Sequence, residues 1–343
     1  MSDGVFRPRR ARRGSGAVTL HDVARMAGVA PITASRAVNT PALVSPDVLK
    51  RVQEAIARTG YVPNRMAGAL ASARSRLVAA VVPTIAGPVF LQTIEALTQA
   101  LADAGYHLML GQTGYADNRE GALLEAIIGR RPDGIVVTGV MHSPSARKLL
   151  VASGIPVVET WDLTPTPIDM LVGFSHPEVG RRVAGFFHAK GRRRLGIVVG
   201  DDERAARRLQ AFQGEALALG LDPALAEVVP APTTLRSGRE ALGRLLARAP
   251  QVDAIFCSSD LLALGVLTEA QARGIDVPRQ LAIVGFGDLE FAADVHPALT
   301  SVHIKGAEIG RQAARFILDR VEGRAEGPPV VDIGFSIIER QTT

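Results

Sequence analysis

The sequence predicts a multidomain protein, with a small all-α head followed by a large α/β core. Two bursts of apolar residues at helical spacing, joined by a single Gly-Val, lie within Val18–Asn39 (VTLHDVARMAGVAPITASRAVN). From Leu77 onward, short apolar strand candidates alternate with helix candidates, which is typical of parallel sheets covered by helices on both faces. Of the 343 residues, 47% are apolar but only 4% are aromatic. The cores are therefore expected to be aliphatic, as in parallel α/β proteins.

Charge is unevenly divided between the two parts. Residues 1–76 contain 13 Lys or Arg and 4 Asp or Glu, a net of +9, whereas the remainder has 26 against 30, a net of −4. A basic head on a mildly acidic core indicates that the head meets a polyanion. Residues 1–17 are expected to be a disordered basic tail, and a solvated tail without a partner is the alternative.

Compartment signals favour the cytoplasm. The single cysteine, Cys257, excludes an internal disulfide framework and fits a reducing environment. The arginine-rich start lacks the apolar segment of a secretory signal. Prolines and a glycine interrupt the longest apolar run, Leu77–Phe90, so no membrane span is expected.

The first two helices of the head have clear boundary signals. Thr19 and Asp22 form a T-x-x-D capping pair, and Gly28 ends the first helix. Pro31 suits the first position of the second helix, where its missing N–H is no loss. Ala34, Ala37 and Val38 are the apolar candidates of that second helix, and its outer face carries Ile32, Thr33, Ser35 and Arg36.

A third helix candidate begins at Ser45 and stops at Gly60. The three apolar faces can only be buried against one another, which predicts a helix-turn-helix with its second helix directed at the DNA major groove. There, the forked donor of Arg36 can read guanine. An ordinary three-helix bundle is the alternative. Tyr61–Ser75 either becomes ordered on docking, with Leu70 as a minor-groove wedge, or is an alanine-rich linker.

The segments TLHDVARMAGVAPITASRAVN (19–39) and VSPDVLKRVQEAIARTGYVPNRMAGAL (44–70) resemble the DNA-binding head of the LacI/GalR family of transcriptional regulators. The resemblance implies a DNA-binding domain over 18–63 and a hinge helix over 64–76. Ala30 departs from the pattern, because the family usually has a Ser or Thr helix cap there. The implied DNA contacts are Thr19, Pro31, Ile32, Thr33, Ser35, Arg36 and Asn39 in the domain, and Asn64, Ala67 and Leu70 in the hinge, with Ala67 against its dimer mate.

The core follows as a series of strand and helix candidates over 77–343. The strand candidates are Val78–Val82, His107–Gly111, Gly134–Thr138, Pro156–Glu159, Leu195–Val199, Ala254–Cys257 and Leu281–Gly285. The helix candidates are Phe90–Ala104, Arg119–Gly129, Arg207–Leu219, Gly238–Ala249 and Leu261–Arg273. The strands divide around Gly173–His176, which predicts two similar lobes with a cleft between them.

The family resemblance also implies a periplasmic-binding-protein-like core whose chain crosses between the lobes three times. The crossings are expected near Ser175, near His303–Lys305 and near the last strand. His176 and His303 are interpreted as hydrogen-bonded structural residues at these crossings. The implied effector-binding and dimerisation core has lobe 1 over about 77–174 and 305–326, and lobe 2 over about 175–304 and 327–343.

Ligands of such sheets bind beyond the carboxyl ends of the strands. The effector-binding candidates at these ends are Thr84, Phe90, Gln112, Tyr115, Trp161 and Asp162 in lobe 1, and Arg204, Arg208, Ser259, Asp260 and Asp288 in lobe 2. Trp161 is alternatively a core residue, and Asp260 alternatively a helix cap. Arg208 matches the family's main effector-binding arginine. Gly287 occupies the position where the family commonly has an aspartate, and Asp288 follows it.

The stretch IPVVETWDLTPTPIDMLVGFSH (155–176) resembles the gluconate-operon repressors of the family. The resemblance implies gluconate or a related sugar acid as effector, and its carboxylate would pair bidentately with Arg208. A neutral sugar, a purine or a corepressor is the alternative effector, and a non-regulatory sugar-binding receptor is the alternative function.

The sequence contains no phosphate-binding loop, nucleophile elbow or metal-ligating cluster. Cys257 is expected to be a buried, inert thiol. The sequence therefore predicts a regulator that is not an enzyme and uses no cofactor or metal. The resemblance implies a homodimer that binds a palindromic double-stranded operator and is released by its effector.

Overall fold

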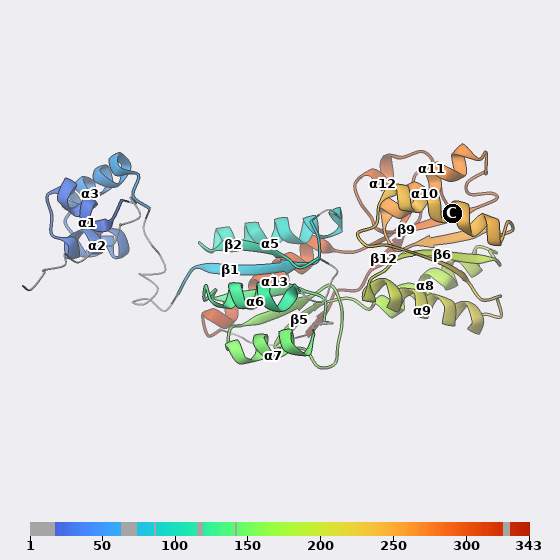
Figure 1. Ribbon diagram of the computed structural model, residues 1–343, viewed down its shortest axis with the longest axis horizontal. Coiled ribbons are helices and arrows are strands. Elements are labelled where there is room, and N and C mark those ends of the chain that lie inside the picture. Colours follow the sequence, from blue (N-terminus) through green and yellow to red (C-terminus); the bar gives the residue numbers. More distant parts are fainter. Residues whose placement is uncertain (1–17, 63–73, 86, 115–118, 141–142, 325–329) are drawn as a thin grey trace, which may run out of the picture. The chain divides into compact units, whose positions relative to one another are not determined.

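The computed structural model describes residues 18–62, 74–85, 87–114, 119–140, 143–324 and 330–343. The chain divides into two units between Ser75 and Arg76, a helical head and an α/β core (Figure 1). The predicted fold class is confirmed. The sequence-based expectations for the tail (1–17) and for Asn64, Ala67, Leu70 and Tyr115 fall outside the described residues.

Over its described residues, 18–62 and 74–75, the head has three α-helices and a short 3₁₀ turn. They are α1 (Leu20–Ala27), α2 (Pro31–Asn39), η1 (Pro41–Leu43) and α3 (Pro46–Thr59). Thr19 and Asp22 form the predicted capping box at the start of α1, and this bonding lowers the pKa of Asp22. Gly28 ends α1 in the left-handed region at φ +63°. Ala30 supplies no side-chain cap to α2, as predicted.

The head has its own small hydrophobic core. The buried side chains that cluster in this core are Val23, Ala27, Ala37, Val52 and Ala55. Each helix contributes at least one of them, so no helix of this unit buries its apolar face alone. Because Ala34 and Ala37 face inward, the opposite side of α2 is left for solvent or a partner.

The core contains two six-stranded sheets, one in each lobe. The first has the order β11-β5-β4-β3-β1-β2. Its strands are β1 (Leu77–Val82), β2 (His107–Gln112), β3 (Gly134–Thr138), β4 (Val157–Thr160), β5 (Met170–Gly173) and β11 (Val330–Asp332). The second has the order β12-β10-β9-β8-β6-β7. Its strands are β6 (Leu195–Gly200), β7 (Leu225–Val229), β8 (Ala254–Cys257), β9 (Ala282–Gly287), β10 (Thr300–His303) and β12 (Ser336–Ile338).

Helices cover both faces of each sheet, because alternate strand residues belong to different cores. In β1, Val78 and Ala80 pack with two helices of one face, α5 (Leu91–Asp103) and α13 (Gly306–Val321). Ala79 and Val81 pack with two helices of the other face, α6 (Glu120–Ile128) and α7 (Pro144–Ser153). The second sheet is covered by α8 and α9 on one face and by α10 and α11 on the other. The helical elements are η2 (Pro88–Phe90), α5 (Leu91–Asp103), α6 (Glu120–Ile128), α7 (Pro144–Ser153), α8 (His176–Ala189), α9 (Glu203–Ala218), α10 (Leu235–Arg248), α11 (Asp260–Ala272), α12 (Phe291–Asp294) and α13 (Gly306–Val321).

The chain crosses between the lobes three times, after β5, after β10 and between β11 and β12. The assignment of 327–343 to lobe 2 is wrong at Val330–Asp332, because β11 pairs with β5 of the first sheet. The expectation of parallel pairing also fails at one edge, where β12 returns antiparallel to β10. Both strands are three residues long, and that is too short for a clear periodic signal.

Candidate functional site

The exposed face of α2 is the candidate DNA-binding surface of the head. Ile32 is 62% exposed, and Arg36 is also exposed. Ser35 is half-buried, and Asn39 Nδ2 donates a hydrogen bond to its Oγ over 3.3 Å. Thr33, also half-buried, and exposed Pro31 belong to the first turn of the same helix. This face combines an apolar side chain, a forked cation and small hydroxyls, the groups that read base edges and bind phosphates.

A cavity that is open to solvent lies between the two lobes of the core. The residues that line it follow β1 and β4 of the first sheet and β6, β7, β8 and β9 of the second. Both sheets reverse their strand order nearby, since β1 lies between β2 and β3, and β6 lies between β7 and β8. Such switch points are where α/β sheets leave a crevice for ligands.

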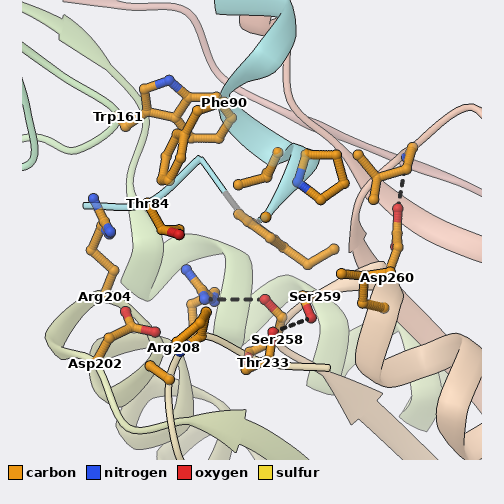
Figure 2. A pocket seen from close by; sticks show the side chains of 18 of the residues that line it. Thr84, Phe90, Trp161, Asp202, Arg204, Arg208, Thr233, Ser258, Ser259 and Asp260 are labelled. Atoms are coloured by element: carbon orange, nitrogen blue, oxygen red, sulfur yellow. Dashed lines mark hydrogen bonds between the residues drawn. The ribbon is translucent and has the colours of Figure 1, made fainter. Parts of the chain in front are cut away.

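Lobe 1 contributes an apolar wall. The rings of Phe90 and Trp161 meet edge to face with their centroids 5.0 Å apart (Figure 2). The ring of Phe174 packs edge to face on Trp161, with the centroids 5.8 Å apart. Trp161 is only 3% exposed and adopts φ +66°. Its Nε1 donates a hydrogen bond to Thr93 Oγ1 over 3.0 Å. The indole is therefore held firmly in place as part of the cavity wall.

Lobe 2 contributes a polar wall around Arg208, which is 4% exposed (Figure 2). Arg208 Nη1 lies 2.8 Å from His176 Nδ1, and Nη2 donates to the Ser258 carbonyl over 3.4 Å. Its guanidinium stacks on Phe286 at 4.2 Å from the ring centroid. Thr233 Oγ1 and Ser259 Oγ are 2.9 Å apart beside it. A buried guanidinium next to hydroxyls is chemically suited to a small anion that carries hydroxyl groups.

Seven of the nominated effector residues line this cavity. They are Thr84, Phe90, Trp161, Arg204, Arg208, Ser259 and Asp260. Arg204 belongs to lobe 2, yet its guanidinium lies 5.4 Å from the ring centroid of Phe90 in lobe 1. The two walls are thus in contact through a cation–π interaction at the cavity.

Asp162, which the sequence nominates as an effector contact, does not line the cavity. Its carboxylate is 1% exposed and accepts two hydrogen bonds from Arg207 Nη1, at 3.0 and 3.1 Å. Leu163 N donates a third, over 2.8 Å. Burial raises the pKa of Asp162, although these partners oppose the shift. The carboxylate is already occupied by an ion pair that joins β4 of lobe 1 to α9 of lobe 2.

Gln112 and Asp288 also lie outside the cavity lining. Gln112 is the exposed last residue of β2, which is the edge strand of its sheet. Asp288 accepts from His303 Nδ1 over 2.9 Å and pairs with Arg340 Nη1 at 2.7 Å. The carboxylate of Asp288 therefore stabilises the lobe 2 segment near a crossing.

The structure adds cavity residues that sequence reasoning missed. The polar and aromatic ones are His176, Asp202, Thr233, Ser258 and Phe286. Asp202 follows β6 and caps α9 by accepting from Ala205 N over 3.0 Å, and a D-x-x signature before a helix could have located it. Thr233 follows β7, which was not among the strand candidates. The position of Thr233 at the end of a strand was therefore not predicted.

Asp260 lines the cavity but its carboxylate is bonded within lobe 2. Oδ1 accepts from Ser301 Oγ over 2.6 Å, and Oδ2 accepts from Leu289 N over 2.7 Å. The cap of α11 is Ser259, whose side chain accepts from Leu262 N, so Asp260 is not itself the cap. Burial raises the pKa of Asp260 from 3.8 to about 6, and the nearby Asp288 carboxylate adds to the shift.

This shift predicts a pH-dependent contribution to stability. Between the unfolded pKa of 3.8 and the folded pKa of about 6, the folded state binds more protons, so stability falls as pH rises. In Asp260→Asn the amide oxygen can accept from Leu289 N, and the amide nitrogen can donate to Ser301 Oγ, so both contacts remain without the charge although the second one is reversed. The free energy of unfolding of Asp260→Asn, relative to that of wild type, should rise by about 2 kcal/mol between pH 4.5 and pH 7. Urea unfolding at both pH values measures this, and a pH-independent difference would contradict it.

In the described part of the chain, there is no support for a reactive thiol, a metal site or a membrane-spanning helix. Cys257 is fully buried, and burial raises the pKa of its thiol well above the ordinary value. Among the described residues, His, Cys, Asp and Glu side chains form no group of three that could hold a metal ion. None of the described helices has the length and apolarity needed to cross a membrane.

Comparison with known proteins gives matches to both parts of the chain. The model "Bacterial regulatory proteins, lacI family" matches residues 19–64, and "Periplasmic binding protein-like domain" matches residues 184–343. HTH-type transcriptional regulator GntR of Pseudomonas aeruginosa is 38% identical over 96% of this chain and 97% of its own length.

Solved structures agree with these matches. The crystal structure of a LacI family transcriptional regulator from Silicibacter pomeroyi has a TM-score of 0.90 and 34% identity, covering 95% of this chain and 99% of that one. Transcription regulator GntR from Chromobacterium violaceum has a TM-score of 0.75 and 34% identity, covering 78% of this chain and 98% of that one.

Proposed function

The chain belongs to the LacI family of bacterial regulatory proteins, and from this premise we propose that it represses genes of sugar-acid catabolism. In this proposal a homodimer binds a palindromic operator through its two heads. Gluconate or a related sugar acid enters the interlobe cavity of each core and releases the operator. The observation that carries the effector assignment is the buried guanidinium of Arg208 among hydroxyl groups at the cavity wall.

The chemistry of the cavity fits a hydroxylated carboxylate. Arg208 provides a forked donor for the carboxylate, and Thr233, Ser258 and Ser259 provide groups for the hydroxyls. The rings of Phe90 and Trp161 cover the opposite side, where the C–H faces of a polyol chain would pack. The GntR names of similar proteins support the same class of effector.

In the head, the proposal assigns base reading to the start of α2 and to Arg36. The hinge residues Asn64, Ala67 and Leu70 would extend the interface into the minor groove, with Leu70 as the wedge. Two heads of a dimer would reach half-sites in successive major grooves. Effector and operator would oppose each other by a shared coupling free energy, so operator binding must weaken effector binding by the same factor.

Arg36→Ala tests the base-reading role. We expect a loss of about 1–3 kcal/mol in operator binding and a relaxed preference at one base pair of each half-site. The measurement is fluorescence anisotropy with the operator and with duplexes substituted at each position. The matched control is Arg58→Ala on α3, also an exposed arginine of the head. A base preference identical to wild type would remove this role from Arg36.

Effector identity can be measured without a label, because Trp161 is the only tryptophan and lines the cavity. Tryptophan fluorescence and thermal stability would be followed during titration with gluconate, ketogluconates, neutral hexoses and purines. A sugar acid should change the emission, raise the melting temperature and release the operator. If only neutral sugars or purines do so, the sugar-acid assignment is wrong.

A further inference from the structure

His176 occupies an unusual place in the core. It is the first residue of α8, directly after the chain crosses from β5 of lobe 1 into lobe 2. It is 1% exposed and lines the effector cavity behind Arg208. Its ring packs edge to face on Phe174, with centroids 4.7 Å apart. His176 thus lines the cavity and contacts residues of both lobes.

Both ring nitrogens of His176 are engaged, and their partners define the protonation state. Nε2 lies 2.9 Å from the Trp161 carbonyl, which can only accept a hydrogen bond. Nδ1 lies 2.8 Å from Arg208 Nη1, which can only donate one. His176 is therefore neutral, with its proton on Nε2. Burial and the neighbouring Arg208 charge lower its pKa well below 6.5, in agreement with this assignment.

The two partners of His176 belong to different lobes. Trp161 follows β4 of lobe 1, and Arg208 lies on α9 of lobe 2. From Trp161 the hydrogen bonds continue through Thr93 Oγ1 to the Gly306 carbonyl, at 3.0 and 2.9 Å. Gly306 begins α13 just after the second crossing of the chain. A hydrogen-bonded path thus joins the cavity arginine to two of the segments that connect the lobes.

We propose that His176 is a positioning residue that holds the Arg208 guanidinium toward the effector and ties its orientation to the arrangement of the two lobes. This inference rests on the proposed role of Arg208 as the effector's carboxylate ligand. When the lobes shift, the Trp161 carbonyl moves, His176 follows it, and the guanidinium loses or gains alignment with the carboxylate. Effector binding and lobe arrangement are thereby coupled through one imidazole, and the coupling acts in both directions.

Three substitutions separate the two hydrogen bonds of His176. His176→Phe keeps a ring against Phe174 and removes both bonds. His176→Asn places an amide oxygen near the position of Nδ1, so it retains an acceptor for Arg208 and loses the donor to Trp161. His176→Gln places an amide nitrogen near Nε2, so it retains the donor and loses the acceptor. Phe174→Leu is the control, because it disturbs the ring packing and leaves both hydrogen bonds.

The readouts are the gluconate Kd from Trp161 fluorescence, the operator Kd with and without gluconate, and the melting temperature. We expect His176→Phe and His176→Gln to weaken gluconate binding at least tenfold, because both variants lose the acceptor that holds the Arg208 guanidinium. His176→Asn should bind gluconate within about threefold of wild type but lose most of the gluconate-induced change in operator affinity. Phe174→Leu should lower the melting temperature and keep both responses.

Two results would overturn the inference. One is a wild-type gluconate Kd and operator release in His176→Phe. The other is a loss of gluconate affinity in all three His176 variants that follows only their loss of melting temperature, which would indicate a structural role only. Arg208→Ala separates this failure from failure of the proposed function. If Arg208→Ala also responds normally, the effector assignment itself is wrong; if only Arg208→Ala fails to respond, the inference alone is lost.

Discussion

Arg208→Ala is expected to weaken gluconate binding by about 3 kcal/mol, more than a hundredfold, and to abolish operator release. The guanidinium is 4% exposed, so its hydrogen bonds to a carboxylate would form away from competing water. Removing it would leave the effector's charge in a low-dielectric cavity without its partner. Operator affinity in the absence of gluconate should be unchanged, because the variant leaves the head intact.

The measurement combines the fluorescence titration with operator anisotropy at saturating gluconate. Arg208→Lys should give an intermediate loss, because it keeps the charge but lacks the planar fork. Arg244→Ala is the matched control, since Arg244 pairs with Glu227 away from the cavity lining and should behave as wild type. An Arg208→Ala protein that still releases the operator at wild-type gluconate concentrations would place the anion elsewhere.

The second large effect concerns Gly265, where α10 and α11 approach each other most closely. A Cβ at Gly265 would lie 2.1 Å from the Leu235 carbonyl oxygen, and a Cβ at Gly238 would lie 2.3 Å from the Leu262 carbonyl oxygen. These neighbours are backbone atoms and cannot rotate away, so the helices would have to separate. We expect Gly265→Ala to lower the free energy of unfolding of the core by about 3 kcal/mol.

The control substitution, Gly214→Ala, is expected to have the opposite effect on stability. Gly214 lies inside α9, and nothing stands within 4 Å of a Cβ added there. Gly214→Ala should therefore stabilise the core by about 0.5–1 kcal/mol, because alanine loses less backbone entropy in a helix. Urea unfolding of both variants measures the difference. Equal free energies for the two variants would contradict the close-packing explanation.

The head was predictable almost to the residue. The boundaries of α1, α2 and α3 follow the capping and stop signals at Thr19, Gly28, Pro31, Ser45 and Gly60. Caps and stops are local, because they depend on a side chain and backbone groups within about four residues. The missing side-chain cap at Ala30 was visible for the same reason.

In the core, the local signals located strands but not all of their partners. Apolar runs between turn signals predicted β1, β3, β6 and β8, because parallel strands that are buried on both faces are apolar along their whole length. Short strands such as β11 carry too few residues for such a pattern. Their sheet assignment depends on where the chain returns after α13 and its following segment.

The amino-acid sequence by itself determined the helix ends of the head, the apolar runs of the main strands and the edge of each sheet at which polar residues gather. Tertiary structure decided which of those polar residues face the cavity. Asp162 and Arg208 both follow strand ends, yet Asp162 is paired with Arg207, 45 positions away, and Arg208 lines the cavity. The physical reason is that secondary structure depends on neighbouring residues, whereas the direction of a side chain in a cleft depends on segments brought together from both lobes.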